Sequence, residues 1–169
     1  MLYEILTIGY IATLATAQPI DDEADEEYPS NWVVRIERDA FTARVNAAAR
    51  LTALNGDVLS FACNGHEDSI LSVQFLTQRH LGSRNNVVTL KFGEDAPIAP
   101  ITWEYSSQGA YIVDEPYIEI FSQSASTEVQ RILVRALNYE DQPVDAAFIS
   151  RNARSAINEL RLACGSEAL

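Results

Sequence analysis

The stretch N-G-D-V-L-S-F-A-C-N-G, Asn55–Gly65, decides the fold expected from this sequence. Its apolar run, Val58–Cys63, has an Asn-Gly pair on each side, and such pairs turn the chain between strands. A second apolar run, Ile70–Leu76, is predicted to form the other strand of a hairpin. The unit therefore predicts antiparallel β-structure with a cysteine at the end of one strand.

Other short segments of the same character occur along most of the chain. Phe41–Leu54 is ambiguous, because its alanines favour a helix whereas F-T-A-R-V at its start alternates. The segments predicted as further strands are Trp32–Glu37, Val87–Phe92, Ile101–Tyr105, Ala110–Val113, Arg131–Leu137 and Val144–Ile149. With the first hairpin, the sequence predicts a sheet of about eight short strands.

Two helices are predicted beside the strands. The first begins at Pro116, since proline and the acidic residues before it suit a helix N-terminus, and it runs to about Ser124. The second covers Ser150–Cys164, where small and apolar residues recur at helical spacing. Ser150 is a plausible N-cap and Gly165 a good C-terminal stop. The predicted fold class is therefore α+β.

The N-terminal 17 residues are predicted to be a signal peptide. They are apolar and end in Ala15-Thr16-Ala17, a small-x-small pattern typical of a signal-peptidase site. The apolar run is about ten residues long, too short to span a bilayer as a helix. However, Glu4 is the only charged residue there, whereas a signal peptide normally begins with positive charge. A strand or a packed helix of the mature fold is the alternative.

An acidic run, D-D-E-A-D-E-E, occupies Asp21–Glu27. Like charges at this density repel and stay solvated, so residues 18–30 are predicted to be a flexible linker before a single domain at 31–169. A calcium site is the alternative, but the run lacks the glycine and the spacing of a calcium loop. The formal net charge of −12 is opposite to what phosphate binding requires, so no nucleic-acid partner is expected.

The two cysteines, Cys63 and Cys164, favour a disulfide, because their count is even and the chain is expected to be exported. This bridge would tie the C-terminal helix to the sheet. A metal site is the alternative for Cys63 and His66, but it needs three or four ligands, and the only other histidine is His80. We expect no bound metal and no cofactor, and a periplasmic or secreted location.

Side chains that follow Cys63 are interpreted as an exposed hairpin tip and a candidate contact loop: His66, Glu67 and Asp68. Aromatic residues form the second candidate surface, since tyrosine and tryptophan are enriched at interfaces. Trp103 is predicted to lie in the core on the same strand face as Tyr105, beneath a helix. The surface candidates are Tyr105, Tyr111 and Tyr117.

Catalytic motifs are missing from the sequence. It contains no Gly-x-Ser-x-Gly elbow and no glycine-rich phosphate loop. A paired Cys63 would provide no thiolate. Acidic residues are too common to identify a pair for glycosidic chemistry. We therefore expect no enzyme; a secreted hydrolase that uses carboxylates, or His66 with a serine, is the catalytic alternative.

Several short motifs occur in an order that resembles a known family. They are L-S-F-A-C-N-G, L-S-V-Q-F, V-V-T-L-K-F-G, W-E-Y and A-I-N-E-L-R-L-A-C-G. Over about residues 31–165, this order resembles the VasI-like accessory domains associated with type VI secretion and related small exported bacterial domains. The resemblance implies an exported α+β domain with a Cys63–Cys164 bridge and no established catalysis. Lys91 stands where an arginine is expected, and the acidic linker is not part of the pattern.

We therefore expect an exported accessory or interaction module that contacts a protein partner in the envelope. After removal of the signal peptide it would not be an integral membrane protein. A structural component of a phage-like particle or surface assembly is the second hypothesis.

Overall fold

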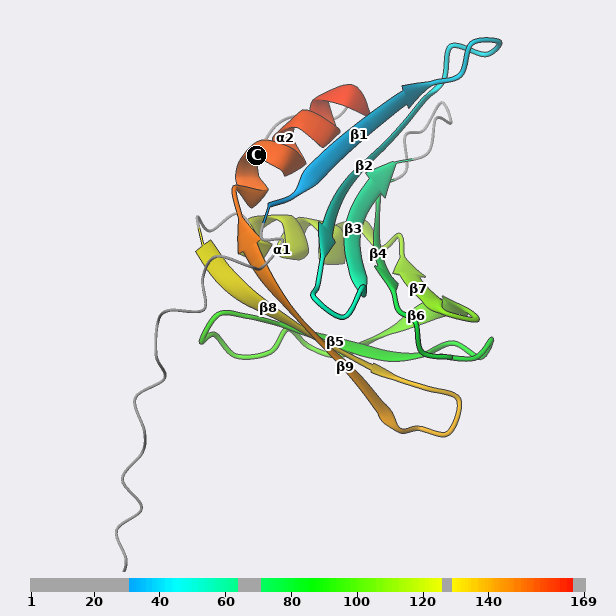
Figure 1. Cartoon of the computed structure of the whole chain (residues 1–169), viewed down its shortest axis with the longest axis vertical. Coiled ribbons are helices and arrows are strands. Elements are labelled where there is room, and N and C mark those ends of the chain that lie inside the picture. The colour runs from blue at the N-terminus through cyan, green and yellow to red at the C-terminus, as the bar shows by residue number, and fades with distance from the viewer. Residues whose placement is uncertain (1–30, 64–70, 126–128, 166–169) are drawn as a thin grey trace, which may run out of the picture.

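The computed structural model describes residues 31–63, 71–125 and 129–165 (Figure 1). Its elements, in chain order, are β1 (Val33–Arg38), β2 (Val45–Thr52), β3 (Val58–Cys63), β4 (Leu71–Leu76), β5 (Asn86–Phe92), β6 (Ile101–Ser106), β7 (Gly109–Ile112), α1 (Glu115–Ala125), β8 (Val129–Leu137), β9 (Pro143–Arg151) and α2 (Ala153–Ala163). The predicted α+β class is confirmed. The structure has nine strands in the described residues, and the additional one is β2, in the segment that the sequence left ambiguous.

All nine strands form one sheet with the order β1-β2-β3-β4-β7-β6-β5-β8-β9, and every neighbouring pair is antiparallel. The predicted hairpin is present, because β3 pairs with β4 from Val58↔Leu76 to Cys63↔Leu71. The crossover comes at β5–β7: β4 pairs with β7, and β5 pairs with β8. Strand order therefore does not follow chain order in the middle of the sheet.

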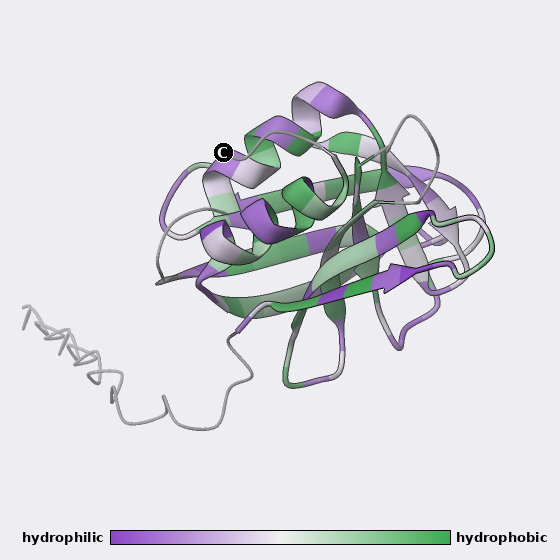
Figure 2. Cartoon of the chain, turned by 90° about the horizontal axis from the view of Figure 1, so that it is seen from above, coloured by the Kyte–Doolittle hydropathy of each residue, from purple (hydrophilic) through white to green (hydrophobic). Residues whose placement is uncertain are grey.

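Both helices lie side by side over one face of the curved sheet, as Figure 2 shows. Phe121 of α1 packs between the two halves of the sheet, with its ring centroid 5.9 Å from that of Phe61 on β3 and 5.6 Å from that of Phe92 on β5. Trp103 on β6 is buried and meets Tyr117 of α1 edge to face. The prediction that Trp103 packs in the core beneath a helix is therefore confirmed.

The two edge strands of the sheet, β1 and β9, meet at the start of β1. Asn31 forms an isolated parallel bridge with Arg151 of β9, and the indole Nε1 of Trp32 donates a 2.8 Å hydrogen bond to Oγ of Ser150. The prediction of Ser150 as a helix N-cap is wrong, because β9 continues through Arg151 and α2 starts at Ala153. Asn152 holds the N-cap position in the left-handed region (φ 58°) without a side-chain cap.

Candidate interaction surfaces

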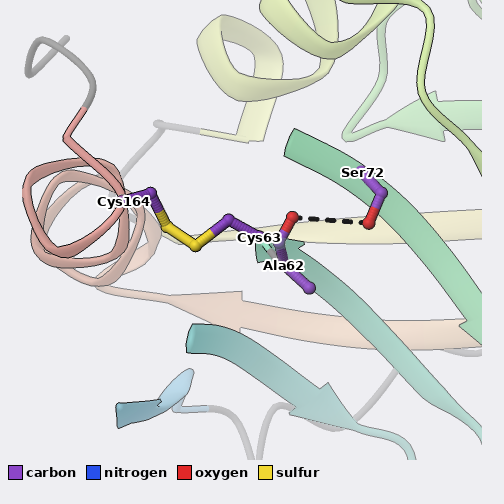
Figure 3. The surroundings of a disulfide bond; sticks show 4 residues. All are labelled: Ala62, Cys63, Ser72 and Cys164. Carbon is purple, nitrogen blue, oxygen red and sulfur yellow. Dashed lines mark hydrogen bonds between the residues drawn. A yellow bond between two sulfur atoms is a disulfide. The ribbon is translucent and has the colours of Figure 1, made fainter. Parts of the chain in front are cut away.

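The disulfide joins Cys63, the last residue of β3, to Cys164, which follows α2 (Figure 3). The two Cα atoms are 6.2 Å apart, and both side chains are buried. On the other side of β3, the hydroxyl of Ser72 donates to the carbonyl of Ala62 at 3.3 Å. Cys63 therefore offers no thiolate to a metal or a substrate, and the bridge itself is typical of an extracytoplasmic protein.

The three residues of the predicted contact loop, His66, Glu67 and Asp68, lie outside the described residues. His80 is described, and its ring lies 5.5 Å from that of Tyr139. Within the described residues, no group of three or more His, Cys, Asp or Glu side chains is placed to hold a metal ion. Neither of the two described helices is long and apolar enough to cross a membrane.

The three predicted surface tyrosines do not share one surface. Tyr105 and Tyr117 lie in the core, where burial raises the pKa of both phenols to about 12. Both are therefore removed from the candidate surface. Tyr111 on β7 is 37% exposed, and its hydroxyl donates a hydrogen bond to the carboxylate of Glu104 on β6. Only Tyr111 of the three could reach a partner.

A surface that sequence reasoning missed lies at the tip of the β1–β2 hairpin, which projects from the sheet in Figure 1. Phe41 at this tip is 99% exposed. Two more apolar side chains of β1 are also exposed: Val33 (55%) and Ile36 (48%). The available signal was the turn-forming Asp39 two residues before Phe41, in D-A-F-T-A-R, whereas the ambiguous helix or strand segment predicted above begins with Phe41 itself.

Hydrogen bonds to Asp39 stabilise the turn at this tip. Its carboxylate accepts from the backbone N–H groups of Thr42 (2.6 Å) and Phe41 (2.9 Å) and from the hydroxyl of Thr42 (2.9 Å). These donors, the Thr42 N–H first, lower the pKa of Asp39. Ala43 has a positive φ of 56° and donates its N–H to the Asp39 carbonyl at 2.9 Å. The tip therefore presents Phe41 on an ordered turn.

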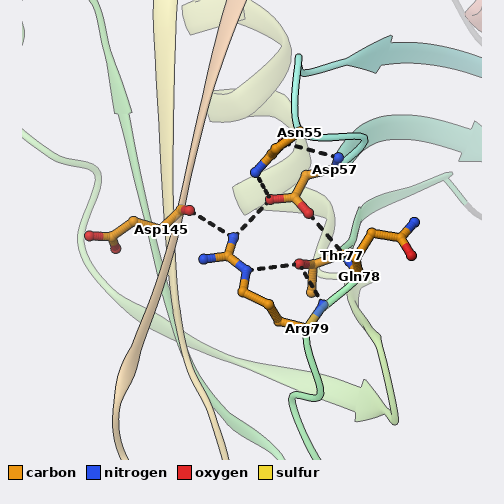
Figure 4. Close-up of polar contacts among 6 residues, drawn as sticks. All are labelled: Asn55, Asp57, Thr77, Gln78, Arg79 and Asp145. Atoms are coloured by element: carbon orange, nitrogen blue, oxygen red, sulfur yellow. Dashed lines mark hydrogen bonds and ion pairs between the residues drawn. The ribbon is translucent and has the colours of Figure 1, made fainter.

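A buried carboxylate, Asp57, is the last residue of the β2–β3 turn (Figure 4). It accepts hydrogen bonds from Asn55 at 2.9 Å and from the guanidinium of Arg79 at 2.8 Å. Arg79 also donates to the carbonyl of Asp145 on β9 at 2.7 Å and to the hydroxyl of Thr77 at 3.3 Å. Because its partners come from turns and strand ends, this network joins distant parts of the fold, and its role is structural.

A hollow of about 440 Å³ lies on the face of β5, β8 and β9 that points away from the helices. Its charged residues are Lys91, Arg131, Arg135 and Asp145. The guanidinium of Arg135 forms a bidentate ion pair with the carboxylate of Asp145, through two hydrogen bonds of 2.7 Å each. Lys91 and Arg131 have no ion-pair partner in the described part of the chain. We call this feature the cationic hollow.

Comparison with known proteins gives little further information. No family model matches the sequence, and no curated protein matches it. Among solved structures, one match is invasion associated protein B from Bartonella henselae, with 15% sequence identity and a TM-score of 0.48, covering 81% of this chain and 94% of that protein. A match at this level carries no argument about function. The resemblance to VasI-like domains is not confirmed and stays a prediction.

Proposed function

We propose that this protein is an exported, non-catalytic accessory module that binds another protein through the tip of its β1–β2 hairpin. The observation that carries the proposal is Phe41, an aromatic side chain that is 99% exposed on an ordered turn. Leaving an aromatic ring in water is unfavourable, and such residues become binding hot spots when a partner encloses them. An ordered tip also loses little conformational entropy on binding.

The other parts of the proposal have separate support. The disulfide between Cys63 and Cys164 is consistent with an oxidising, extracytoplasmic compartment. The pairing of both cysteines removes the thiol groups from catalysis. A role beside a secretion system follows only from the resemblance of the short motifs to VasI-like domains, and it remains the finer part of the proposal.

Photo-crosslinking from position 41 tests the contact. A benzophenone amino acid replaces Phe41 in the complete protein, and a second variant carries it at Tyr139, which is 53% exposed on the β8–β9 turn. We expect a crosslinked product of one defined mass from position 41 that is missing from position 139. Identical products from both positions, or none from position 41, would contradict the proposal.

A substitution measures the contribution of the ring to binding. Phe41→Ser should leave the free energy of unfolding within about 0.5 kcal/mol of the wild type, because an exposed side chain makes few contacts. Its affinity for the partner identified by crosslinking should fall by about 30-fold or more, the loss typical of a hot-spot residue. Calorimetry or surface plasmon resonance gives the affinity, and Tyr139→Ser is the matched control. An unchanged affinity for Phe41→Ser would place the contact elsewhere.

A further inference from the structure

The cationic hollow has a regular arrangement of charge. In the sheet register, Lys91 on β5 lies opposite Leu133 on β8. Arg131 and Arg135 are therefore its diagonal neighbours, with Cα atoms about 7–8 Å away. Since Asp145 pairs with Arg135, the two unpaired cations of the hollow are Lys91 and Arg131, and each lies next to the apolar Leu133. A chain with spaced carboxylates would match this surface.

The densest run of negative charge in the chain lies in one segment. All 12 basic residues lie within the described residues, whereas the run D-D-E-A-D-E-E places six acidic residues in Asp21–Glu27. This run contains half of the formal net charge of −12. The chain therefore contains both a cationic surface and a dense anionic segment.

We propose that Asp21–Glu27 docks on the cationic hollow of its own chain. The described fold begins at Asn31, which lies beside Arg151 and runs parallel to β9. Residues before Asn31 that keep this course pass along β9 toward Ala147, which the register places beside Leu133. At about 3.3–3.6 Å per residue, Glu27 reaches about 14 Å from Asn31, and Asp21 reaches about 35 Å.

These lengths match the position of the hollow. Strands rise about 3.4 Å per residue and lie about 4.8 Å apart. The cross-strand row of Lys91, Leu133 and Ala147 therefore lies about 14 Å along β9 from Arg151. Within this row, Lys91 is two strands away from β9. The arginines of the β1–β2 hairpin follow Asn31 in the chain, so they lie on the other side of Asn31 from a segment that continues along β9. This docking uses a different surface from the Phe41 tip and does not depend on it.

Lys91 makes the docking directly testable, because it is the only lysine in the chain. Carbodiimide coupling forms an amide bond, with loss of water, between Nζ of Lys91 and a carboxylate that contacts it. Trypsin then releases Lys91 in peptide 85–131 and the acidic segment in the peptide that ends at Arg35. We expect mass spectrometry of the complete, disulfide-bonded protein to find these two peptides joined through a residue of Asp21–Glu27.

Four controls define the result. Lys91→Arg keeps the charge and removes the amine, so the joined peptides should disappear. In Arg131→Gln, trypsin releases Lys91 in peptide 85–135, and the yield of its joined form should fall severalfold, whereas Arg154→Gln, at an exposed position of α2, should leave the yield unchanged. About 0.5 M NaCl should also lower the yield, since it screens exposed charges. A mixture of ¹⁴N- and ¹⁵N-labelled chains shows whether each crosslink lies within one chain.

Several outcomes would overturn the docking. They are crosslinks of Lys91 only to acidic residues of its own peptide, joined peptides only between different chains, or a yield that Arg131→Gln leaves unchanged. The last would mean that the segment meets Lys91 by chance collisions, not by binding to the hollow. Urea unfolding of Arg131→Gln checks that the variant remains folded, which we expect because Arg131 is exposed.

Discussion

One side-chain hydrogen bond connects the first strand region to the last strand. Trp32 is 7% exposed, Ser150 is fully buried, and the indole N–H donates to the serine hydroxyl across 118 positions of sequence. A buried donor that loses its acceptor and cannot reach water has no hydrogen bond to offset the cost of its desolvation, so the folded state is destabilised by that full cost. The serine therefore stabilises the junction of β1 and β9.

Ser150→Ala should lower the free energy of unfolding by about 1–3 kcal/mol, because it leaves Nε1 of Trp32 buried without this acceptor. Urea denaturation followed by tryptophan fluorescence measures the change. Ser155→Ala, at an exposed position of α2, is the matched control and should cause no loss. Equal stability of the two variants would show that water reaches the indole after substitution.

At this scale the sequence predicted residues whose role follows from their type and number. The paired cysteines and the buried Trp103 were both expected, and both are observed. The role of Ser150 could not be predicted, because its partner is fixed only when β9 and the start of β1 come together. Phe41 was missed for a related reason: apolar residues normally indicate burial, and only the turn at Asp39 shows that this one is exposed.

Among the elements, β2 shows how tertiary pairing decides between helix and strand. Its alanine-rich sequence V-N-A-A-A-R-L-T suits a helix. However, Ala47, Ala49 and Leu51 alternate with more exposed residues, and the strand pairs with β1 on one side and β3 on the other. Small side chains on this face leave room for α2, so alanine here reflects close packing. Propensity alone could not reveal this.

The two helices are joined to each other by an ion pair. Nη1 of Arg161 on α2 donates to the carboxylate of Glu119 on α1 at 2.9 Å, and Gln123 donates to the same carboxylate at 3.0 Å. The Arg161 hydrogen bond, followed by that of Gln123, lowers the pKa of Glu119 below its usual 4.5. The ion pair therefore stabilises the helix layer only while Glu119 is ionised.

The pH dependence of this contribution has a defined sign. Since the folded-state pKa of Glu119 lies below the unfolded value, its stabilisation is fully present above about pH 4.5 and is lost as the pH falls through the folded pKa. Glu119→Gln should therefore be less stable than the wild type at pH 7, by less than about 1 kcal/mol because the pair is partly exposed. The deficit should shrink as the pH falls below about 4.5 and disappear below the folded-state pKa.

Urea unfolding at pH 7 and at pH 3 measures this difference. The matched control is Glu159→Gln, an exposed carboxylate of α2 without an ion pair in the described part of the chain. It should show no comparable deficit at either pH. A Glu119→Gln deficit that is the same at pH 3 and pH 7 would mean that packing of the side chain, and not its charge, joins the helices.

In the whole molecule, the sheet is assembled from pairings that are distant in sequence. The hairpins β1–β2, β3–β4 and β8–β9 follow from turns and alternation, and most of their strands were predicted from these signals. By contrast, β4–β7 and β5–β8 join non-consecutive strands. No local pattern specifies which strand edge meets which, because burial of the shared core decides it. Strand order was therefore not predictable.

The disulfide acts on this whole arrangement through the unfolded chain. It closes a loop with a sequence separation of 101, from the end of β3 to the end of α2. Closing a loop of about 100 residues lowers the entropy of the unfolded ensemble, which corresponds to about 4–5 kcal/mol as an upper figure. Domains of this size have a total stability of about 5–15 kcal/mol. The bridge is thus expected to supply a substantial part of it.

Replacing both cysteines, Cys63→Ala with Cys164→Ala, should lower the free energy of unfolding by up to about 4–5 kcal/mol, while the far-ultraviolet circular dichroism of the folded state stays close to that of the wild type. Urea denaturation measures the loss, and the wild type under reducing conditions should lose a similar amount.

Hydrogen exchange locates the effect. If the bridge acts on the unfolded chain, protection falls uniformly across the core strands and α2, because global unfolding limits their exchange. A loss of protection confined to α2 would instead show that the bridge mainly holds this helix against β3.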